Sequence, residues 1–231
     1  MRLHRFFIEE QLRNKTDISI FEDDVIHQWK DVFRLRSGDR LILLDNTGFE
    51  YLTEIVVLAK GKADLKILDR SISSSSPEKD IWLYAAMIKK DNYEWILEKG
   101  TEVGVSHFVP IVSDRTEKKD INMERARKII KEASEQSGRG IMPTLDEPTD
   151  LAEAIKNVTV PLLAFHMTGE KFVADFHNSK EKIAILIGPE GGWSDRELDL
   201  FKQKEIPVYS VGNLVLRAET AAIVVSALFN L

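Results

Sequence analysis

The feature that most constrains the fold of this chain is a serine-rich segment, residues 71–77 (Ser-Ile-Ser-Ser-Ser-Ser-Pro), where the pattern of secondary structure changes. Before it, short apolar runs at 41–44 and 49–58 flank a tight turn at 45–48, which is typical of β-hairpins. After it, buried strands alternate with amphipathic helices, the pattern of a mainly parallel sheet covered on both faces. The sequence therefore predicts an α/β protein with a small β-barrel over 1–70, a linker over 71–79 and a sheet domain over 80–231.

The apolar periodicity predicts the individual elements. In the first part we expect an apolar run at 6–8, a helix over 24–35 and strands over 41–44, 49–58 and 61–68. In the second part we expect strands over 81–87, 107–112, 161–165, 183–187 and 207–211. Helices are expected over 91–104, 122–137, 151–156, 195–204 and 218–229. Open parallel sheets bind ligands outside the carboxyl ends of their strands, so the loops there are the candidate site.

Composition excludes several classes of protein. The 231 residues are 43% hydrophobic and 30% charged, which is ordinary for a soluble globular chain. There is no cysteine, which excludes disulfides and thiolate metal sites and fits a reducing cytoplasm. The start lacks an apolar signal core, and the longest apolar runs, 183–187 and 221–228, are too short to span a bilayer. We therefore expect a cytoplasmic protein with no membrane partner and no metal.

Charge is distributed unevenly along the chain. The net charge of −6 argues against nucleic acid, because phosphate binding needs clustered Lys and Arg. Residues 115–139, however, hold eight basic residues against five acidic ones. The basic residues are Arg115, Lys118, Lys119, Arg125, Arg127, Lys128, Lys131 and Arg139. Such a run is most often the solvated face of an amphipathic helix, and an RNA contact is the alternative.

A glycine-rich loop follows the predicted strand at 183–187. It reads Gly188-Pro-Glu-Gly-Gly192, and Ser194-Asp-Arg-Glu197 then fits a capping box that opens a helix. Glycines let a ligand approach the backbone closely, and a helix start offers free N–H groups. A tight structural turn is an equally good reading of this loop alone. The spacing is not Gly-x-Gly-x-x-Gly, so a dinucleotide-binding fingerprint is excluded.

Two further loops follow predicted strands. In the segment 209–221, Leu214 and Leu216 are placed to sandwich a planar ring, and Arg217 and Glu219 precede an apolar helix. A buried ion pair with a helix cap explains the two charged residues equally well. The loop 164–169 carries His166, a candidate base, although a lone loop histidine is more often a bystander. If the three strands are neighbours, the three loops converge on one pocket.

Together these segments resemble a known family. Ile-Gly-Pro-Glu-Gly-Gly-Trp-Ser-Asp-Arg-Glu at 187–197 and Val-Gly-Asn-Leu-Val-Leu-Arg-Ala-Glu-Thr-Ala-Ala at 211–222 are similar to motifs of the ribosomal RNA small subunit methyltransferase E family, of the SPOUT class. Further matching pieces occur in order at 5–7, 35–39, 99–105, 113–115 and 135–139, so the resemblance covers nearly the whole chain.

The resemblance implies a fold and an activity. It implies a PUA-like barrel that docks RNA, followed by a SPOUT α/β domain with a trefoil knot. The expected reaction is S-adenosylmethionine-dependent methylation of uridine N3 (uridine 1498 in the family) in 16S ribosomal RNA. The expected partners are 16S RNA, naked or in the assembled small subunit, and a second copy of the chain in a homodimer.

The resemblance also assigns residues. The methyl donor is expected to be held, without a metal, by Leu163, Phe165, Gly188, Pro189, Glu190, Gly191, Gly192, Val211, Gly212, Asn213, Leu214, Leu216, Arg217, Glu219 and Thr220. Charge on the uracil is expected to be stabilised by Arg5, Arg115 or Arg139, with Arg217 a weaker candidate. RNA is expected to contact Arg5, Arg36, Arg115, Arg125, Lys128, Lys131, Gln136 and Arg139. No residue stands out as the general base, although Glu190 and Glu219 are possible.

Two alternative functions stay open at this point. A SPOUT enzyme acting on transfer RNA would have the same protein fold. A ribosome-assembly factor without catalysis would use the glycine loops only structurally and would not bind the methyl donor.

Overall fold

A computed structural model describes residues 3–117, 120–173 and 181–230. It divides into two compact units: Met1–Ser76 with Ser134–Met142, here called the N-terminal unit, and Pro77–Ala133 with Pro143–Leu231, the C-terminal unit. Sequence patterning predicted a linker over 71–79 but not that residues 134–142 belong with the first part of the chain. Lys118 and Lys119 of the basic stretch lie outside the described residues.

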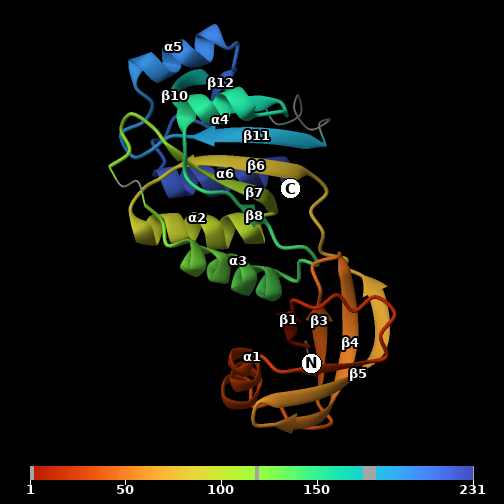
Figure 1. Ribbon diagram of the computed structural model, residues 1–231. Coiled ribbons are helices and arrows are strands. Elements are labelled where there is room, and N and C mark those ends of the chain that lie inside the picture. The colour runs from red at the N-terminus through yellow and green to blue at the C-terminus, as the bar shows by residue number, and fades with distance from the viewer. Residues whose placement is uncertain (1–2, 118–119, 174–180, 231) are drawn as a thin grey trace. The chain divides into compact units, whose positions relative to one another are not determined.

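The N-terminal unit is built on a five-stranded sheet (Figure 1). Its strands follow the order β1-β3-β4-β5-β2, in which β1 and β3 are parallel and the other pairs antiparallel. The elements are β1 (Arg5–Phe7), β2 (Asp17–Ile20), α1 (Asp23–His27), the π-helix η1 (Gln28–Val32), β3 (Arg40–Leu44), β4 (Phe49–Ala59) and β5 (Lys62–Ile72). Phe6, Trp29 and Leu43 lie in its apolar core, where the rings of Phe6 and Trp29 are 5.4 Å apart.

Three elements of this unit differ from the prediction. The helix predicted over 24–35 ends three residues early and changes to π-helical bonding, with the Phe33 N–H donating to the Gln28 carbonyl at 3.0 Å. Strand β2 was not predicted, because Asp17 and Ser19 alternate with only two apolar residues. Strand β5 continues four residues beyond 68, since its end pairs with the start of β4.

Residues 134–142 are fixed to the N-terminal unit by hydrogen bonds. The carboxylate of Glu135 accepts from the Phe7 N–H at 2.8 Å. The Gly48 N–H donates to the Gly140 carbonyl at 3.3 Å, and the Met142 N–H donates to the side chain of Asn46 at 2.8 Å. These bonds join positions about ninety or more residues apart in the chain, so no local sequence pattern predicts them.

The C-terminal unit contains a parallel sheet with the order β12-β10-β11-β6-β7-β8, and β9 also pairs with β7. Its strands are β6 (Asp80–Ala86), β7 (Val105–Val112), β8 (Thr144–Leu145), β9 (Thr149–Asp150), β10 (Leu162–Lys171), β11 (Lys182–Ile187) and β12 (Val208–Ser210). Its helices are α2 (Lys90–Glu102), α3 (Met123–Ser137), α4 (Leu151–Asn157), α5 (Asp195–Gln203) and α6 (Ala218–Asn230). The last four residues of α3 belong to the N-terminal unit.

Helices cover both faces of this sheet (Figure 1). Ala184 and Leu186 of β11 pack in one core with Ile155 of α4 and Phe201 of α5. Successive side chains of a strand point to opposite faces, so Ile183 and Ile185 face the other layer, where α2 and α6 contact each other. Burial on both faces explains why β11 is apolar along almost its whole length and was predictable from sequence.

Strand β10 is longer than predicted. Its pairing with β12 shifts register between Phe165 and Glu170 and then resumes, so residues 166–169 form an irregularity inside the strand. We expected residues 164–169 to form a loop, and this prediction was wrong because they lie within β10. Gly169 is required there, because a Cβ would lie 2.5 Å from the Tyr209 carbonyl carbon. No helix in the described part of the chain is long and apolar enough to cross a membrane.

Candidate active site

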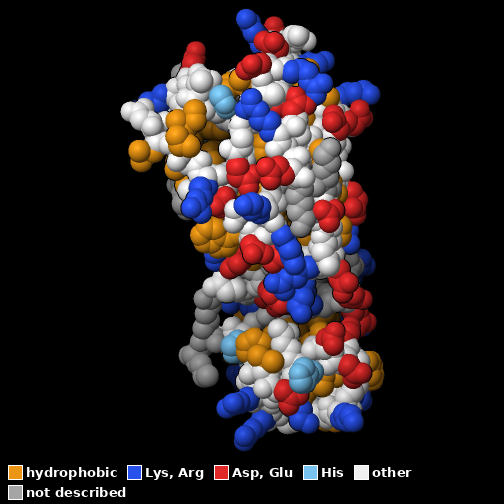
Figure 2. Space-filling view, turned by 90° about the vertical axis from the view of Figure 1, so that its left-hand side faces the viewer, with side chains coloured by type: hydrophobic (Ala, Val, Ile, Leu, Met, Phe, Trp, Pro, Cys, Tyr) orange, Lys and Arg blue, Asp and Glu red, His pale blue; other side chains and the backbone are white. Residues whose placement is uncertain are grey.

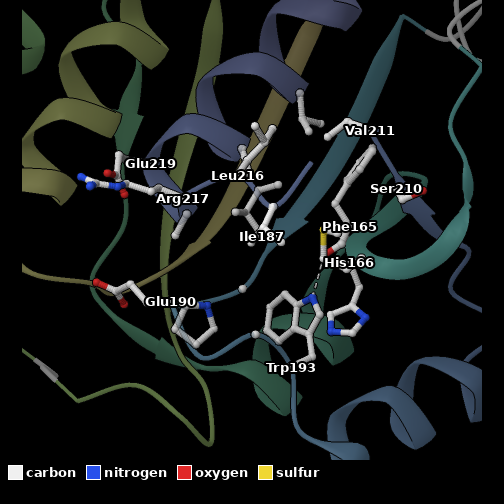
Figure 3. Close-up of a pocket in the computed structure, with 18 of the residues that line it drawn as sticks. Phe165, His166, Ile187, Glu190, Trp193, Ser210, Val211, Leu216, Arg217 and Glu219 are labelled. Atoms are coloured by element: carbon white, nitrogen blue, oxygen red, sulfur yellow. Dashed lines mark hydrogen bonds between the residues drawn. The ribbon is translucent and has the colours of Figure 1, made fainter. Parts of the chain in front are cut away.

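One cavity of about 690 Å³ in the C-terminal unit lies at three neighbouring strands. It is lined by residues 165–167 within β10 and by the segments that follow β11 and β12 (Figure 3). This volume is within the range of small-molecule sites. The predicted donor residues that line it are Phe165, Gly188, Pro189, Glu190, Gly191, Gly192, Val211, Gly212, Leu214, Leu216, Arg217 and Glu219. Three others are absent from this lining: Asn213, Thr220 and Leu163, of which Leu163 is buried at 2% exposure.

The glycine loop is shaped around Trp193. A Cβ on Gly188 would lie 3.1 Å from the Trp193 ring, and Gly192 has a φ of +66°, which favours glycine. The indole N–H of Trp193 donates to the Phe165 carbonyl at 3.0 Å, which ties the loop after β11 to β10 (Figure 3). Sequence reasoning did not assign Trp193 to the site, although it directly follows the glycines.

The segment after β7 is fastened to the start of α5. Ser194 and Glu197 form the predicted capping box, and the second carboxylate oxygen of Glu197 accepts from the Asp114 N–H at 2.8 Å. Asp114 in turn accepts from Ser194 Oγ at 2.6 Å and from the guanidinium of Arg196. These hydrogen bonds hold the pKa of Asp114 below its usual value.

Arg115 is placed beside the glycine loop by this network. Its Nη1 donates to the Gly191 carbonyl at 2.5 Å, and a Cβ on Gly191 would lie 3.2 Å from Arg115 Cδ. His166 lines the cavity, and burial together with Arg115 lowers the pKa of its imidazole. Arg115 is not itself among the residues that line the cavity, but it bonds to the Gly191 segment, which does line it.

The cavity has two chemically different ends. Phe165, Ile187, Val211 and Leu216 form apolar walls, whereas Glu190, Arg217 and Glu219 group on the opposite side (Figure 3). Lys89 and Asn92, from the start of α2, also line the cavity. These two residues lie about a hundred positions before the glycine loop, and no sequence signal connected them with it.

The other two candidate arginines, Arg5 and Arg139, lie in the N-terminal unit. The guanidinium of Arg5 donates to Glu50 at 3.3 Å, and a Cβ on Gly138 would lie 3.5 Å from its Nε. Arg139 is 5% exposed, and this burial lowers its pKa to about 10. Both arginines are thus packed within the unit that carries them.

The predicted RNA contacts on α3 are exposed or partly exposed. Arg125 forms an ion pair with Glu94, whereas Lys128 and Lys131 have no such pair with the described residues. Arg36 and Gln136, both in the N-terminal unit, are also exposed. On the face drawn in Figure 2, basic side chains lie among acidic ones and form no continuous basic surface. Among the described residues, no group of three His, Asp or Glu side chains is placed to hold a metal.

Comparison with known proteins defines the class. An RNA methyltransferase domain model matches residues 75–230, and an RNA methyltransferase PUA domain model matches residues 30–68. The fold and these matches define an RNA methyltransferase architecture with a PUA domain, as the sequence motifs predicted.

Individual relatives define the family. The ribosomal RNA small subunit methyltransferase E of Helicobacter pylori (strain J99) is 30% identical over 229 residues, which cover 96% of this chain and 98% of that protein. The enzyme of the same name from Rickettsia conorii is 29% identical over 228 residues, which cover 96% of this chain and 93% of that protein. The chain belongs to the ribosomal RNA small subunit methyltransferase E family.

A solved structure from Legionella pneumophila, in complex with the cofactor S-adenosylmethionine, has the same fold. Its TM-score is 0.90 at 26% identity, and the match covers 99% of this chain and 97% of that one. The predicted α/β fold class is therefore confirmed, while the trefoil knot stays a prediction.

Proposed function

We propose that this chain transfers a methyl group from S-adenosylmethionine to N3 of a uridine in 16S ribosomal RNA, uridine 1498 in the family. Membership of the family supports the reaction class. The observation that supports donor binding is the cavity formed at residues 165–167 of β10 and by the segments after β11 and β12, which has apolar walls, glycine loops and one charged end. The Legionella structure of the same fold contains this cofactor.

The cavity residues fit the parts of the donor. The apolar walls suit the adenine ring, and the loop backbones at 188–192 and 211–216 are available for its polar edge. When bound, the donor supplies an electrophilic methyl group that needs no metal. The protein's contribution is then to position the acceptor base and to stabilise the charge that develops on it.

Arg115 is our first candidate for stabilising the uracil. Uridine N3 carries an imide proton and lies on the pairing edge, so the base must be unpaired or flipped out before it reacts. Loss of that proton leaves negative charge on the flanking carbonyl oxygens, which a guanidinium stabilises. His166, whose pKa is lowered by burial and by Arg115, is a candidate acceptor for the proton.

The remaining RNA contacts are proposed from both units. Arg36 and Gln136 of the N-terminal unit and Arg125, Lys128 and Lys131 of α3 would contact phosphates. Replacing Lys128 with alanine should weaken binding evenly across RNA sequences and lower the slope of log affinity against log salt by about 0.7 to 0.9. An unchanged slope would remove this residue from the RNA interface.

A homodimer and action in the cytoplasm are part of the proposal. Trp95 on α2 and Val224 and Leu228 on α6 are 49%, 37% and 39% exposed, and α2 contacts α6. We infer that these exposed apolar side chains belong to the interface with a second copy of the chain. Analytical ultracentrifugation of the full chain tests this, since a monomer at micromolar concentration would contradict it.

The decisive experiment is methyl transfer from labelled S-adenosylmethionine to small ribosomal subunits that lack their own modification. The labelled nucleoside is identified by mass spectrometry. Label in 3-methyluridine at one site supports the proposal. Label on transfer RNA alone would keep the fold and change the substrate, and absence of both transfer and donor binding would indicate an RNA-binding factor.

The arginine roles are tested in the same assay with Arg115→Ala and Arg5→Ala. Removing a charge-stabilising donor typically lowers the rate by about 10² to 10³. We expect a loss of this size for Arg115→Ala at unchanged donor affinity. If both variants keep full methylation, the assignment of either arginine to the uracil is wrong.

A further inference from the structure

A second, smaller cavity of about 220 Å³ lies in the C-terminal unit and shares no lining residue with the large one. It is lined by the two residues that follow β6, by the start of α2 and by residues between 120 and 126 around the start of α3. Met87, Ile88 and Ala126, each at most 3% exposed, give it apolar walls. Ligand sites combine such walls with a few polar groups, so the polar residues indicate what the cavity can hold.

One polar side chain of this small cavity, Tyr93 on α2, has a hydroxyl without a partner. The residue is 4% exposed, and its Oη forms no hydrogen bond among the described residues. Burial raises the pKa of the phenol, so the hydroxyl keeps its proton and can both donate and accept. An unpaired buried hydroxyl is costly, which favours a ligand whose polar atoms can bond to it.

The small cavity lies next to the place where methyl transfer is proposed. Strand β6 pairs with β11 in the parallel sheet, and ligands bind outside the carboxyl ends of such strands. Lys89 lines the large cavity, and the next residue, Lys90, lines the small one. Asp120, which also lines it, belongs to the segment between β7 and α3 that carries Arg115. Nucleotides that flank a uridine bound at the large cavity therefore come close to the small one.

We propose that the small cavity binds an unpaired base of the substrate RNA near the methylated uridine, and that the Tyr93 hydroxyl hydrogen-bonds to the edge of that base. The inference rests on the proposed function and adds a second recognised nucleotide to it. Proteins that read single-stranded RNA hold splayed bases by contact with their faces and by hydrogen bonds to their edges. The apolar walls suit the faces of a planar base, and the hydroxyl suits a carbonyl or amino group on its edge.

Two exposed cations beside the small cavity suit the phosphates of the same strand. Lys90 and Arg125 lie 3.8 Å and 3.3 Å from the carboxylate of Glu94, and their side chains are 60% and 50% exposed. The second pair joins α2 to α3, which lie side by side in Figure 1. Phosphate contacts position a nucleic acid, whereas base contacts give selectivity. Because Glu94 and Asp120 balance the two cations, binding here should depend more on the base than on the phosphate.

Methyl transfer to small subunits that lack the modification separates an RNA contact from donor binding. Tyr93→Phe removes only the hydroxyl, and Ala126→Met fills the cavity with a flexible side chain. Tyr84→Phe on β6 is the matched control, since Tyr84 is 5% exposed and lines neither cavity. We expect the KM for subunits to rise about fivefold in Tyr93→Phe, which loses one hydrogen bond. It should rise about tenfold in Ala126→Met, which narrows the pocket.

The affinity for S-adenosylmethionine, measured by calorimetry, should be unchanged in all three variants, and the control should methylate as the wild type does. An unchanged KM in both cavity variants would overturn the inference. Weaker donor binding in Tyr93→Phe would assign the cavity to the donor and also overturn it. Wild-type protein that methylates no subunits would instead overturn the proposed function, and this inference with it.

Subunits reconstituted with a single abasic nucleotide, moved along either side of the target uridine, identify the base. At one position the abasic substrate should raise the KM of the wild type, and Tyr93→Phe should add little to that effect. Additive effects at every position would contradict the contact.

Thermal unfolding of the free protein tests a structural role of the same hydroxyl. Tyr93→Phe should be at least as stable as the wild type, because it removes a buried polar group without a partner. A variant that melts earlier would mean that the hydroxyl serves the fold, which would overturn the inference.

Discussion

Two buried glutamates of the C-terminal unit, Glu197 and Glu219, occupy equivalent positions in their helices but differ in their hydrogen-bond partners. Each lies in the first turn of a helix that follows a parallel strand, α5 after β11 and α6 after β12. They are 4% and 2% exposed. Glu197 accepts backbone N–H groups of Ser194 and Asp114 with its two oxygens, whereas Oε2 of Glu219 accepts none among the described residues.

This difference separates a carboxylate whose two oxygens join two segments of the protein from one whose Oε2 has no partner among the described residues. The oxygens of Glu197 are occupied by two segments of the protein, so its contribution is to the fold and to the position of the 113–116 segment. Glu219 lines the cavity, and within residues 3–117, 120–173 and 181–230 it makes no such bridge. Burial alone therefore does not reveal the role of a charged residue, and the partners of each atom are needed as well.

Removal of the bridging carboxylate gives the largest expected effect. Glu197→Ala leaves two backbone N–H groups without their acceptor and opens a gap at the start of α5. We expect the free energy of unfolding to fall by about 3 kcal/mol, since hydrogen bonds to charged groups contribute about 1.5 to 3 kcal/mol each. Urea unfolding measures this, with Glu153→Ala, an exposed position on α4, as the control. A loss no larger than in the control would contradict the bridging role.

A smaller effect, on activity but not on stability, is expected where the 113–116 segment contacts the glycine loop at 188–192. Gly191→Ala places a Cβ 3.2 Å from Arg115 Cδ, which a flexible side chain avoids by moving. The unfolding free energy should change by less than about 0.5 kcal/mol. Displacement of Arg115 should lower the rate of methyl transfer about tenfold. Comparison with Arg115→Ala checks the cause, because the double variant should lose little more than Arg115→Ala alone.

Local sequence signals predicted the Glu197 region better than the Glu219 region. The Ser-x-x-Glu spacing at 194–197 predicted the start of α5, and the structure confirms the capping box. The pair Arg217 and Glu219 had an equally local reading, a buried ion pair, and no such pair forms among the described residues. Whether two charged side chains near each other in sequence meet depends on the packing of α6, which the sequence pattern does not contain.

Features that depend on long-range pairing were not predictable in the same way. Strand β10 extends past residue 165 because it pairs with β12 again after an irregularity. Residues 134–142 join the N-terminal unit because Glu135 bonds to Phe7, 128 positions away. Lys89 enters the cavity lining because α2 begins beside it. Apolar periodicity predicted these strands and helices but not the contacts between them.

The smallest expected effect concerns Asp114, whose carboxylate accepts hydrogen bonds from Arg196 and Ser194. These bonds lower the folded pKa of Asp114 below its value of 3.8 in unstructured peptides. The stabilisation is therefore complete above about pH 5 and is lost as the pH falls through the folded pKa. Because the Arg196 side chain is 83% exposed, solvent screening keeps this contribution small.

Comparison of the wild type with Asp114→Asn isolates this contribution. The wild type should be more stable at pH 6, and the difference should shrink as the pH falls below 3.8 and through the folded pKa of Asp114, since protonation removes the same charge that the substitution removes. Asp199→Asn, an exposed change on α5, the helix that carries Arg196, should show no such trend. A difference that stays constant with pH would mean that Asp114 acts through its shape and hydrogen bonds alone. In that case the buried carboxylates of this region, Glu197 and Glu219, would also have to be compared by their hydrogen-bond partners and not by their charge.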